Sequence, residues 1–178
     1  MEIKNGIMEI KDIIQGRRSI RAYLPDPVSK DQLQSLILEA GIWAPSAGNA
    51  QTWRFLVVTD QSLLRKVELV SPGLSGAPPA LIVICQDLEE SRIKGGTLGP
   101  QLLSIADAAM AAQNIMLYAH ALGLGTCVIA SFHREALQAV LNLPEYLVPI
   151  FIVAVGYPKI IPRAPLRKKD VIWINEYR

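Results

Sequence analysis

The 178-residue sequence predicts an α+β domain built in layers, and three observations carry that prediction. Apolar runs of strand length recur along the chain, helical stretches with apolar stripes lie between them, and loops rich in Gly and Pro join the two. The predicted order is α, α, β, α, β, α, β, α, β. We interpret this order as an α+β layered domain rather than a doubly wound one. No internal boundary is visible, so residues 1–178 are expected to form a single domain.

In the first half of the chain, a helix N-cap and a proline-rich loop mark where the predicted elements begin and end. An amphipathic segment precedes Arg17. Ser29 opens the next helix, because Gln32 completes a capping box before an apolar stripe. Residues 55–58 are predicted to form a strand and residues 61–70 a helix, and the loop that follows them holds two Gly and three Pro within residues 71–79.

The second half continues the alternation of strands and helices. An apolar strand is predicted over residues 81–85, with Cys85 as a core thiol. Further on, strands over residues 127–129 and 149–156 flank a short helix over residues 134–141. The apolar run near the C-terminus, residues 171–174, is expected to add a strand to a sheet of this chain or of a partner.

A long helix is predicted over residues 104–122, and its sequence is rich in alanine. Small side chains let another helix approach closely. Two interpretations stay open, and one segment can satisfy both: a central core helix, and a helix packed against its twin in a dimer.

Composition excludes several classes of partner. A formal charge of +2 and scattered basic residues do not suit nucleic acid. No uninterrupted apolar segment approaches the ~18 residues of a membrane span, and residues 1–4 lack the apolar core of a signal peptide. A cytoplasmic setting is therefore expected. Hydrophobic residues make up 51% of the chain, so we expect apolar surface to be buried against another subunit.

Metal and acid–base chemistry lack the residues they need. His120 and His133 are the only histidines, and neither has a second ligand at metal spacing. His120 is expected to be a helix-end donor and His133 a surface residue. The phosphate loop and the nucleophile elbow are also missing. We therefore assign no metal site. Residue order alone leaves a Ser-His-Asp triad open, and no catalytic side chain is singled out.

A cluster of cations suits a phosphate group. Arg17, Arg18, Ser19 and Arg21 place three guanidinium groups and a hydroxyl within five residues. Guanidinium forks bind phosphate oxygens in a bidentate way, which a lysine ammonium does not do. The same arginines would also suit a solvated helix end. The basic tail from Arg163 onward favours the phosphate, because it supplies a second set of cations.

A second stretch suits a planar polar ring. Residues 44–55 combine small residues, amide side chains and an aromatic just before an apolar run. Small residues allow close backbone approach to the face of a ring, and amides supply hydrogen bonds at its edge. Together the two stretches predict an anionic, ring-bearing cofactor.

The order of these motifs resembles that of the nitroreductase family of FMN-dependent oxidoreductases. Arg-Arg-Ser-x-Arg is followed by Ala-Pro-Ser-x-x-Asn-x-Gln-x-Trp-x-Phe and then by a Gly-Leu-Gly turn. Gly76-Ala77-Pro78 before a strand, residues 107–114 and Val155-Gly156-Tyr157-Pro158 also match. The resemblance extends from about residue 10 to the C-terminus.

The resemblance implies an α+β sandwich with a central, mainly antiparallel sheet flanked by helices. It also implies an intertwined homodimer that holds FMN at the subunit interface. The residues implied for the FMN phosphate and ribityl chain are Arg17, Arg18, Ser19, Arg21 and the tail residue Arg163. The residues implied for the isoalloxazine ring are Pro45, Ser46, Ala47 and Asn49, with the backbone of Ile129, Ala130 and Ser131 near flavin N5.

The implied reaction is ping-pong hydride transfer from NADH or NADPH, through FMN, to a nitroaromatic, quinone or enone. The alternatives are a specialised relative, either a flavin-destroying oxygenase or a reductive dehalogenase, and a flavin-binding module without turnover. The sequence departs from some relatives at Ile161, where they carry Lys, and at Ala130, where they carry an acidic residue. Residues 87–103 are short where larger relatives insert helices over the flavin, which implies an open or differently walled substrate pocket.

Overall fold

A single antiparallel sheet organises the computed structural model, which describes residues 9–176. Its strand order is β1-β2-β4-β3, and all three neighbouring pairs are antiparallel. The strands are β1 (Trp53–Val58), β2 (Ala80–Asp87), β3 (Gly125–Ile129) and β4 (Leu147–Gly156). The α+β class and the antiparallel sheet expected from the sequence are confirmed.

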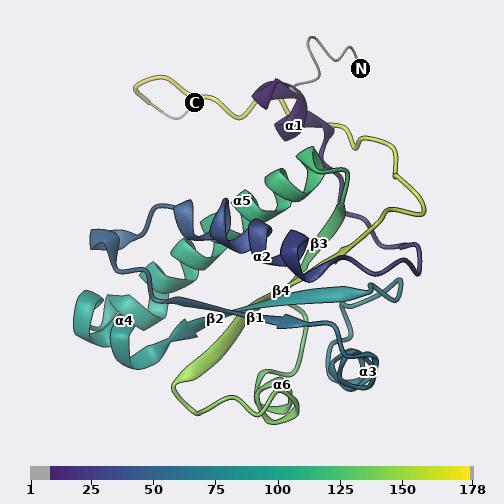
Figure 1. The fold of residues 1–178 in the computed structure, drawn as a ribbon. Coiled ribbons are helices and arrows are strands. Elements are labelled where there is room, and N and C mark those ends of the chain that lie inside the picture. Colours follow the sequence, from purple (N-terminus) through teal and green to yellow (C-terminus); the bar gives the residue numbers. More distant parts are fainter. Residues whose placement is uncertain (1–8, 177–178) are drawn as a thin grey trace.

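Helices cover both faces of this sheet. Within residues 9–176 they are α1 (Ile10–Gly16), α2 (Lys30–Leu38), α3 (Gln61–Leu69), α4 (Leu88–Gly95), α5 (Ser104–Ala121) and α6 (Arg134–Val140). Figure 1 shows α2 and α5 on one face of the sheet, and α3 and α6 on the other. The result is a three-layer arrangement of helix, sheet and helix.

Two apolar clusters, one on each face of the sheet, explain the layers. Successive side chains of a strand point to opposite faces. Ile82 and Ile84 therefore join the cluster that contains α2 and α5, whereas Leu81 and Val83 join the cluster that contains α3 and α6. Every residue of β2 is buried, because the strand is central and covered on both sides.

The helix predicted from Ser29 begins as the sequence indicates. The Ser29 hydroxyl accepts the N–H of Gln32 at 3.1 Å, and the Gln32 side chain accepts the N–H of Ser29 at 3.2 Å. This reciprocal pair is the capping box. Leu33 and Leu36 on the next turns are fully buried and bring α2 onto the sheet.

Helix α5 is the central helix of the larger cluster. Its buried face includes Ala108, Ala111, Ile115 and Ala119, which pack in that cluster. The core role expected for it is confirmed. By length and composition the stretch Gly99–Ala121 could cross a membrane, but in this fold its buried face packs in the core.

Two segments differ from the sequence-based expectation. The predicted order lacked α4, whose sequence has no apolar stripe. The Asp87 side chain caps this helix by accepting the N–H of Glu90 at 3.0 Å. Residues 171–174 form no strand with the sheet of this chain and lie exposed. In Figure 1 the tail leaves β4 and returns past α1.

Candidate functional site

The arginine-rich segment lies along the outer edge of β3. Ser19 pairs with Thr126 in a parallel bridge, and the N–H of Ile20 donates to the Thr126 carbonyl at 2.9 Å. Gly125 permits this close approach, because a Cβ there would lie 2.7 Å from the Ile20 side chain. Further along, the Tyr23 hydroxyl donates to the Ile20 carbonyl at 2.7 Å. Backbone contacts thus fix the segment and leave its polar side chains to other partners.

The two adjacent arginines are placed differently. The guanidinium of Arg18 donates to the carbonyls of Gln15, Gly16 and Arg17 at 2.7, 3.0 and 2.9 Å, so it caps the C-terminus of α1. Arg17 is half-buried. Burial lowers the pKa of Arg17, and the positive charges of Arg167 and Arg18 lower it further. A half-buried cation among other cations attracts an anion.

A hollow of about 270 Å³ lies beside these arginines. His120, in the last turn of α5, forms part of its wall. The Nε2 atom of His120 is buried against Gly16 and has no hydrogen-bond partner among the described residues, so it is not the helix-end donor expected from the sequence. Burial lowers the pKa of His120, as do the charges of Arg17 and Arg18. The other lining residues include Ile20, Thr126, Pro158 and Ile161.

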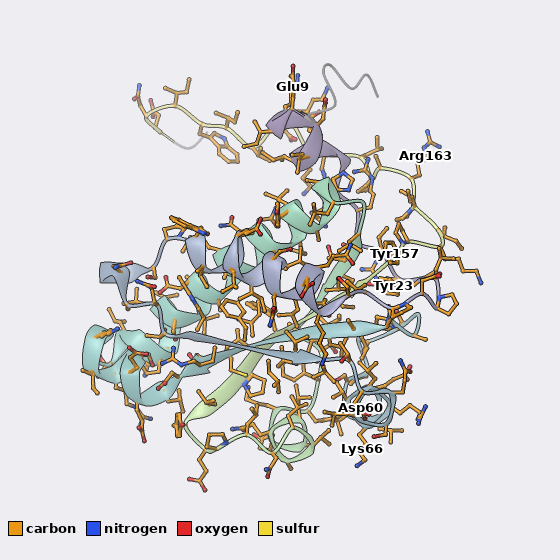
Figure 2. All side chains as sticks on the ribbon, in the orientation of Figure 1. Glu9, Tyr23, Asp60, Lys66, Tyr157 and Arg163 are labelled. Carbon is orange, nitrogen blue, oxygen red and sulfur yellow. The ribbon has the colours of Figure 1, made fainter. Side chains whose placement is uncertain are left out.

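The tail reaches this hollow at Ile161, and two of its arginines are relevant to the predicted phosphate site. Arg163 is exposed, and Figure 2 shows it on the outer bend of the tail. The tail charge that acts on Arg17 is that of Arg167. Arg167 is exposed like the rest of the basic tail, and sequence reasoning did not single it out, because a run of basic residues does not show which of them lies near another charge.

The loop that contains Pro45, Ser46, Ala47 and Asn49 lies near the other end of α5. The Ser46 hydroxyl accepts the N–H of Gln51 at 3.1 Å, and the Gln51 side-chain amide donates to Asn49 Oδ1 at 2.9 Å. Pro45 and Asn49 are exposed, while Ser46 and Ala47 are half-buried. The loop is therefore ordered by its own side chains and presents Asn49 outward.

Asp107, in the first turn of α5, anchors this loop through a hydrogen bond to the loop backbone. Its carboxylate accepts the N–H of Ala47, with distances of 3.2 and 3.3 Å to its two oxygens. Asp107 is only 3% exposed, and burial raises its pKa while the bond from Ala47 lowers it. Sequence reasoning did not assign it to the site. The available signal was an acid among alanines on a buried helix face.

The end of β3 supplies the third group of predicted residues. Ile129 is buried, whereas Ala130 and Ser131 are exposed. The Ser131 carbonyl accepts the N–H of Gly73 at 3.0 Å, which fixes the backbone as it leaves the strand. An open hollow of about 460 Å³ borders Ala130 and reaches Ile105 at the start of α5.

The arginine segment and the Asn49 loop do not meet within one chain. Gly16 contacts His120, and Ala47 is bonded to Asp107. These two α5 residues are 13 positions apart, which corresponds to about 20 Å at a rise of about 1.5 Å per residue. Within one chain, the two groups of predicted residues therefore lie apart, one at each end of α5.

Comparison with known proteins connects this arrangement to a family. The nitroreductase family model matches residues 14–75 and 71–157. A protein of Archaeoglobus fulgidus named for NADH dehydrogenase/NAD(P)H nitroreductase activity is 35% identical over 161 residues, covering 85% of this chain and 86% of that protein. FMN reductase (NADPH) of Bacillus subtilis is 28% identical over 189 residues, covering 93% and 73%. The structure of an FMN-dependent nitroreductase from Clostridium difficile has a TM-score of 0.80 and 27% identity, covering 94% of this chain and 99% of that one.

The family model spans most of the chain, and the shared fold includes both ends of α5, against which the two groups of predicted residues pack. The motif order that resembled this family is thereby confirmed as a family relationship. The chain is an oxidoreductase and belongs to the nitroreductase family.

Proposed function

We propose that this chain binds FMN and works as an NAD(P)H-dependent oxidoreductase. The observation that carries the proposal is a hollow lined by cations at one end of α5 and a polar, exposed loop at the other. FMN held by these residues would supply hydride-transfer chemistry between NADH or NADPH and an acceptor such as a nitroaromatic, quinone or enone, in ping-pong order. The chain's own residues bind and orient the cofactor.

The phosphate half-site is the arginine segment. Arg17, with Ser19 and Arg21, binds the phosphate and ribityl chain, because Arg17 is a half-buried cation beside the hollow. Arg18 contributes by bracing the end of α1, to which it already donates three hydrogen bonds. Tail cations meet the phosphate from another side, Arg163 by family resemblance and Arg167 by its proximity to Arg17.

The ring half-site is the loop at the start of α5. Pro45, Ser46 and Ala47 lie along the isoalloxazine, and Asn49 binds its edge. Gly48 supports this assignment, because a Cβ there would meet nothing within 4 Å, so a flat ring can approach its backbone. The backbone of residues 129–131 approaches the N5 region, where two exposed residues follow the buried end of β3.

A complete site needs two copies of the chain. The two half-sites of one chain are about 20 Å apart along α5. At that separation, the residues that bind the phosphate are not neighbours of the residues that bind the ring edge. A homodimer that places the loop of one copy beside the arginine segment of the other would complete two equal sites. Exposed Trp43 and Ile42, next to the loop, provide apolar surface for that contact.

An anaerobic visible spectrum of the purified protein, recorded before and after NADH or NADPH is added, tests this function. We expect a flavin spectrum that bleaches with at least one of the two nicotinamides. A colourless protein that FMN cannot reconstitute would contradict the cofactor assignment. A flavin spectrum that neither nicotinamide bleaches would contradict the electron donor and favour a binding module without turnover.

A further inference from the structure

The loop over residues 47–51 holds three left-handed residues, and we call it the left-handed loop. The φ angle is +57° at Gly48, +53° at Asn49 and +51° at Gln51. Glycine adopts this conformation freely and asparagine tolerates it, but Gln51 carries the full steric penalty of a Cβ. Such a backbone persists only where its surroundings hold it in place.

The first anchor of the left-handed loop is the carboxylate of Asp107. Its two oxygens lie 3.2 and 3.3 Å from the backbone nitrogen of Ala47, the first residue of the loop. Aspartate is almost never this deeply buried unless it is paired. Among residues 9–176 no cation pairs with Asp107, and Ala47 is its one hydrogen-bond donor. The buried carboxylate of Asp107 therefore has the backbone of this loop as its hydrogen-bonding partner.

The second anchor is Lys94 on α4. Its Nζ donates to the carbonyl of Ala50 at 2.7 Å and lies 2.7 Å from a carboxylate oxygen of Glu90. The other oxygen of Glu90 accepts from Arg54 at 2.6 Å. Glu90 is thus fixed between two cations and directs Lys94 at the loop. Hydrogen bonds with one ionised partner are roughly twice as strong as neutral ones.

We propose that Asp107 and Lys94 are positioning residues that hold the left-handed loop in its binding shape before the cofactor arrives. The proposal rests on the proposed function, because it takes this loop as the place where the ring edge binds. One anchor holds the first N–H of the loop and the other holds the carbonyl of Ala50. Asn49 lies between the two anchors, so its side-chain amide already has its binding position before the cofactor arrives.

Lys94→Met tests the second anchor, because it removes the cation and keeps most of the apolar stem. We expect the Kd for FMN to rise about tenfold, in line with the loss of one charge-assisted hydrogen bond. We also expect faster amide hydrogen exchange over residues 47–51. The thermal midpoint of the flavin-free protein should change little, because the freed loop relaxes its backbone strain. Lys94→Arg restores a cationic donor and should recover most of the affinity.

Asp107→Asn tests the first anchor and keeps an acceptor oxygen in the same place. Because only the charge is lost, we expect a smaller rise in the Kd for FMN, about threefold. Arg92→Met is the matched control for Lys94→Met. It removes a cation from the same exposed helix, and its side chain makes no bond to the loop, so its FMN affinity and loop exchange should equal those of the wild type.

Two outcomes would overturn the proposal. One is an unchanged Kd for FMN in both Lys94→Met and Asp107→Asn. The other is an equal loss in Arg92→Met, which would indicate a general effect of charge rather than a contact. A wild-type protein that binds no FMN would instead contradict the proposed function. Amide exchange in the flavin-free protein would then test the anchors alone, and unchanged exchange in both variants would refute them.

Discussion

At the scale of single residues, the proposed phosphate half-site contains cations that form no ion pair within residues 9–176. The ion pairs among residues 9–176 join Arg54 or Lys94 to acidic residues near α4, and none includes Arg17 or Arg21. His120 is forced toward its neutral form by the same surroundings, since burial and the neighbouring arginines lower its pKa. An anion that binds here would relieve the mutual repulsion of these groups.

The lowered pKa of His120 predicts how stability changes with pH. Its ordinary value is 6.5 and its value in the folded protein is lower, so the unfolded chain binds more protons over that interval. The contribution of His120 to stability is therefore present above pH 6.5 and is lost as pH falls through the folded pKa. In flavin-free protein, the free energy of unfolding of His120→Gln should fall less steeply below pH 6.5 than that of the wild type.

Urea unfolding at a series of pH values measures this difference. His133→Gln is the matched control, because His133 is exposed at the start of α6 and should leave the wild-type slope unchanged. Identical slopes for His120→Gln and the wild type would show that the histidine does not couple protonation to folding.

At the scale of elements, the sequence predicts those parts that carry an apolar stripe or a recognisable cap. Ser29 and Gln32 identify the start of α2, and the apolar run ending at Cys85 identifies β2. Helix α4 has a cap at Asp87 but no apolar stripe, so the sequence pattern does not predict it, and contacts with other segments hold it. One ion pair joins Arg54 on β1 to Glu90, and Gly99 packs so closely that a Cβ there would lie 1.9 Å from the Ser91 carbonyl oxygen. Neither contact leaves a periodic pattern in the sequence.

The capping box at Ser29 predicts a measurable cost for its removal. Ser29→Ala leaves the N–H of Gln32 without its acceptor, and we expect the free energy of unfolding to fall by about 1 kcal/mol. Ser29→Gly should cost only a few tenths of that, roughly 0.3 kcal/mol, because glycine is itself tolerated at a helix start. Chemical denaturation of the three proteins checks the order. Equal stability of Ser29→Ala and the wild type would show that α2 does not depend on this cap.

At the scale of the whole molecule, the length of α5 determines which of the predicted site residues of one chain can meet. The motifs around Arg17 and Asn49 are close in sequence, yet the fold places them against opposite ends of this helix. Motif order predicts which residues belong to the site but not which of them meet, because that depends on how far α5 separates the segments packed on it. The tail illustrates the same limit, since only the fold shows that the charge of Arg167 acts on Arg17.

Complementation between half-site variants tests whether two copies of the chain share one FMN site. Arg17→Ala and Asn49→Ala chains carry different affinity tags, are co-expressed, and are purified through both tags to isolate heterodimers. Each homodimer has one defect in every site. The heterodimer has one site with both defects and one site with none.

Flavin absorbance per dimer gives the result. We expect one tightly bound FMN per heterodimer, against weak binding in both homodimers, because the intact Arg17 of one chain faces the intact Asn49 of the other. A heterodimer that binds FMN no better than either homodimer would refute a shared site and place the whole site within a single chain.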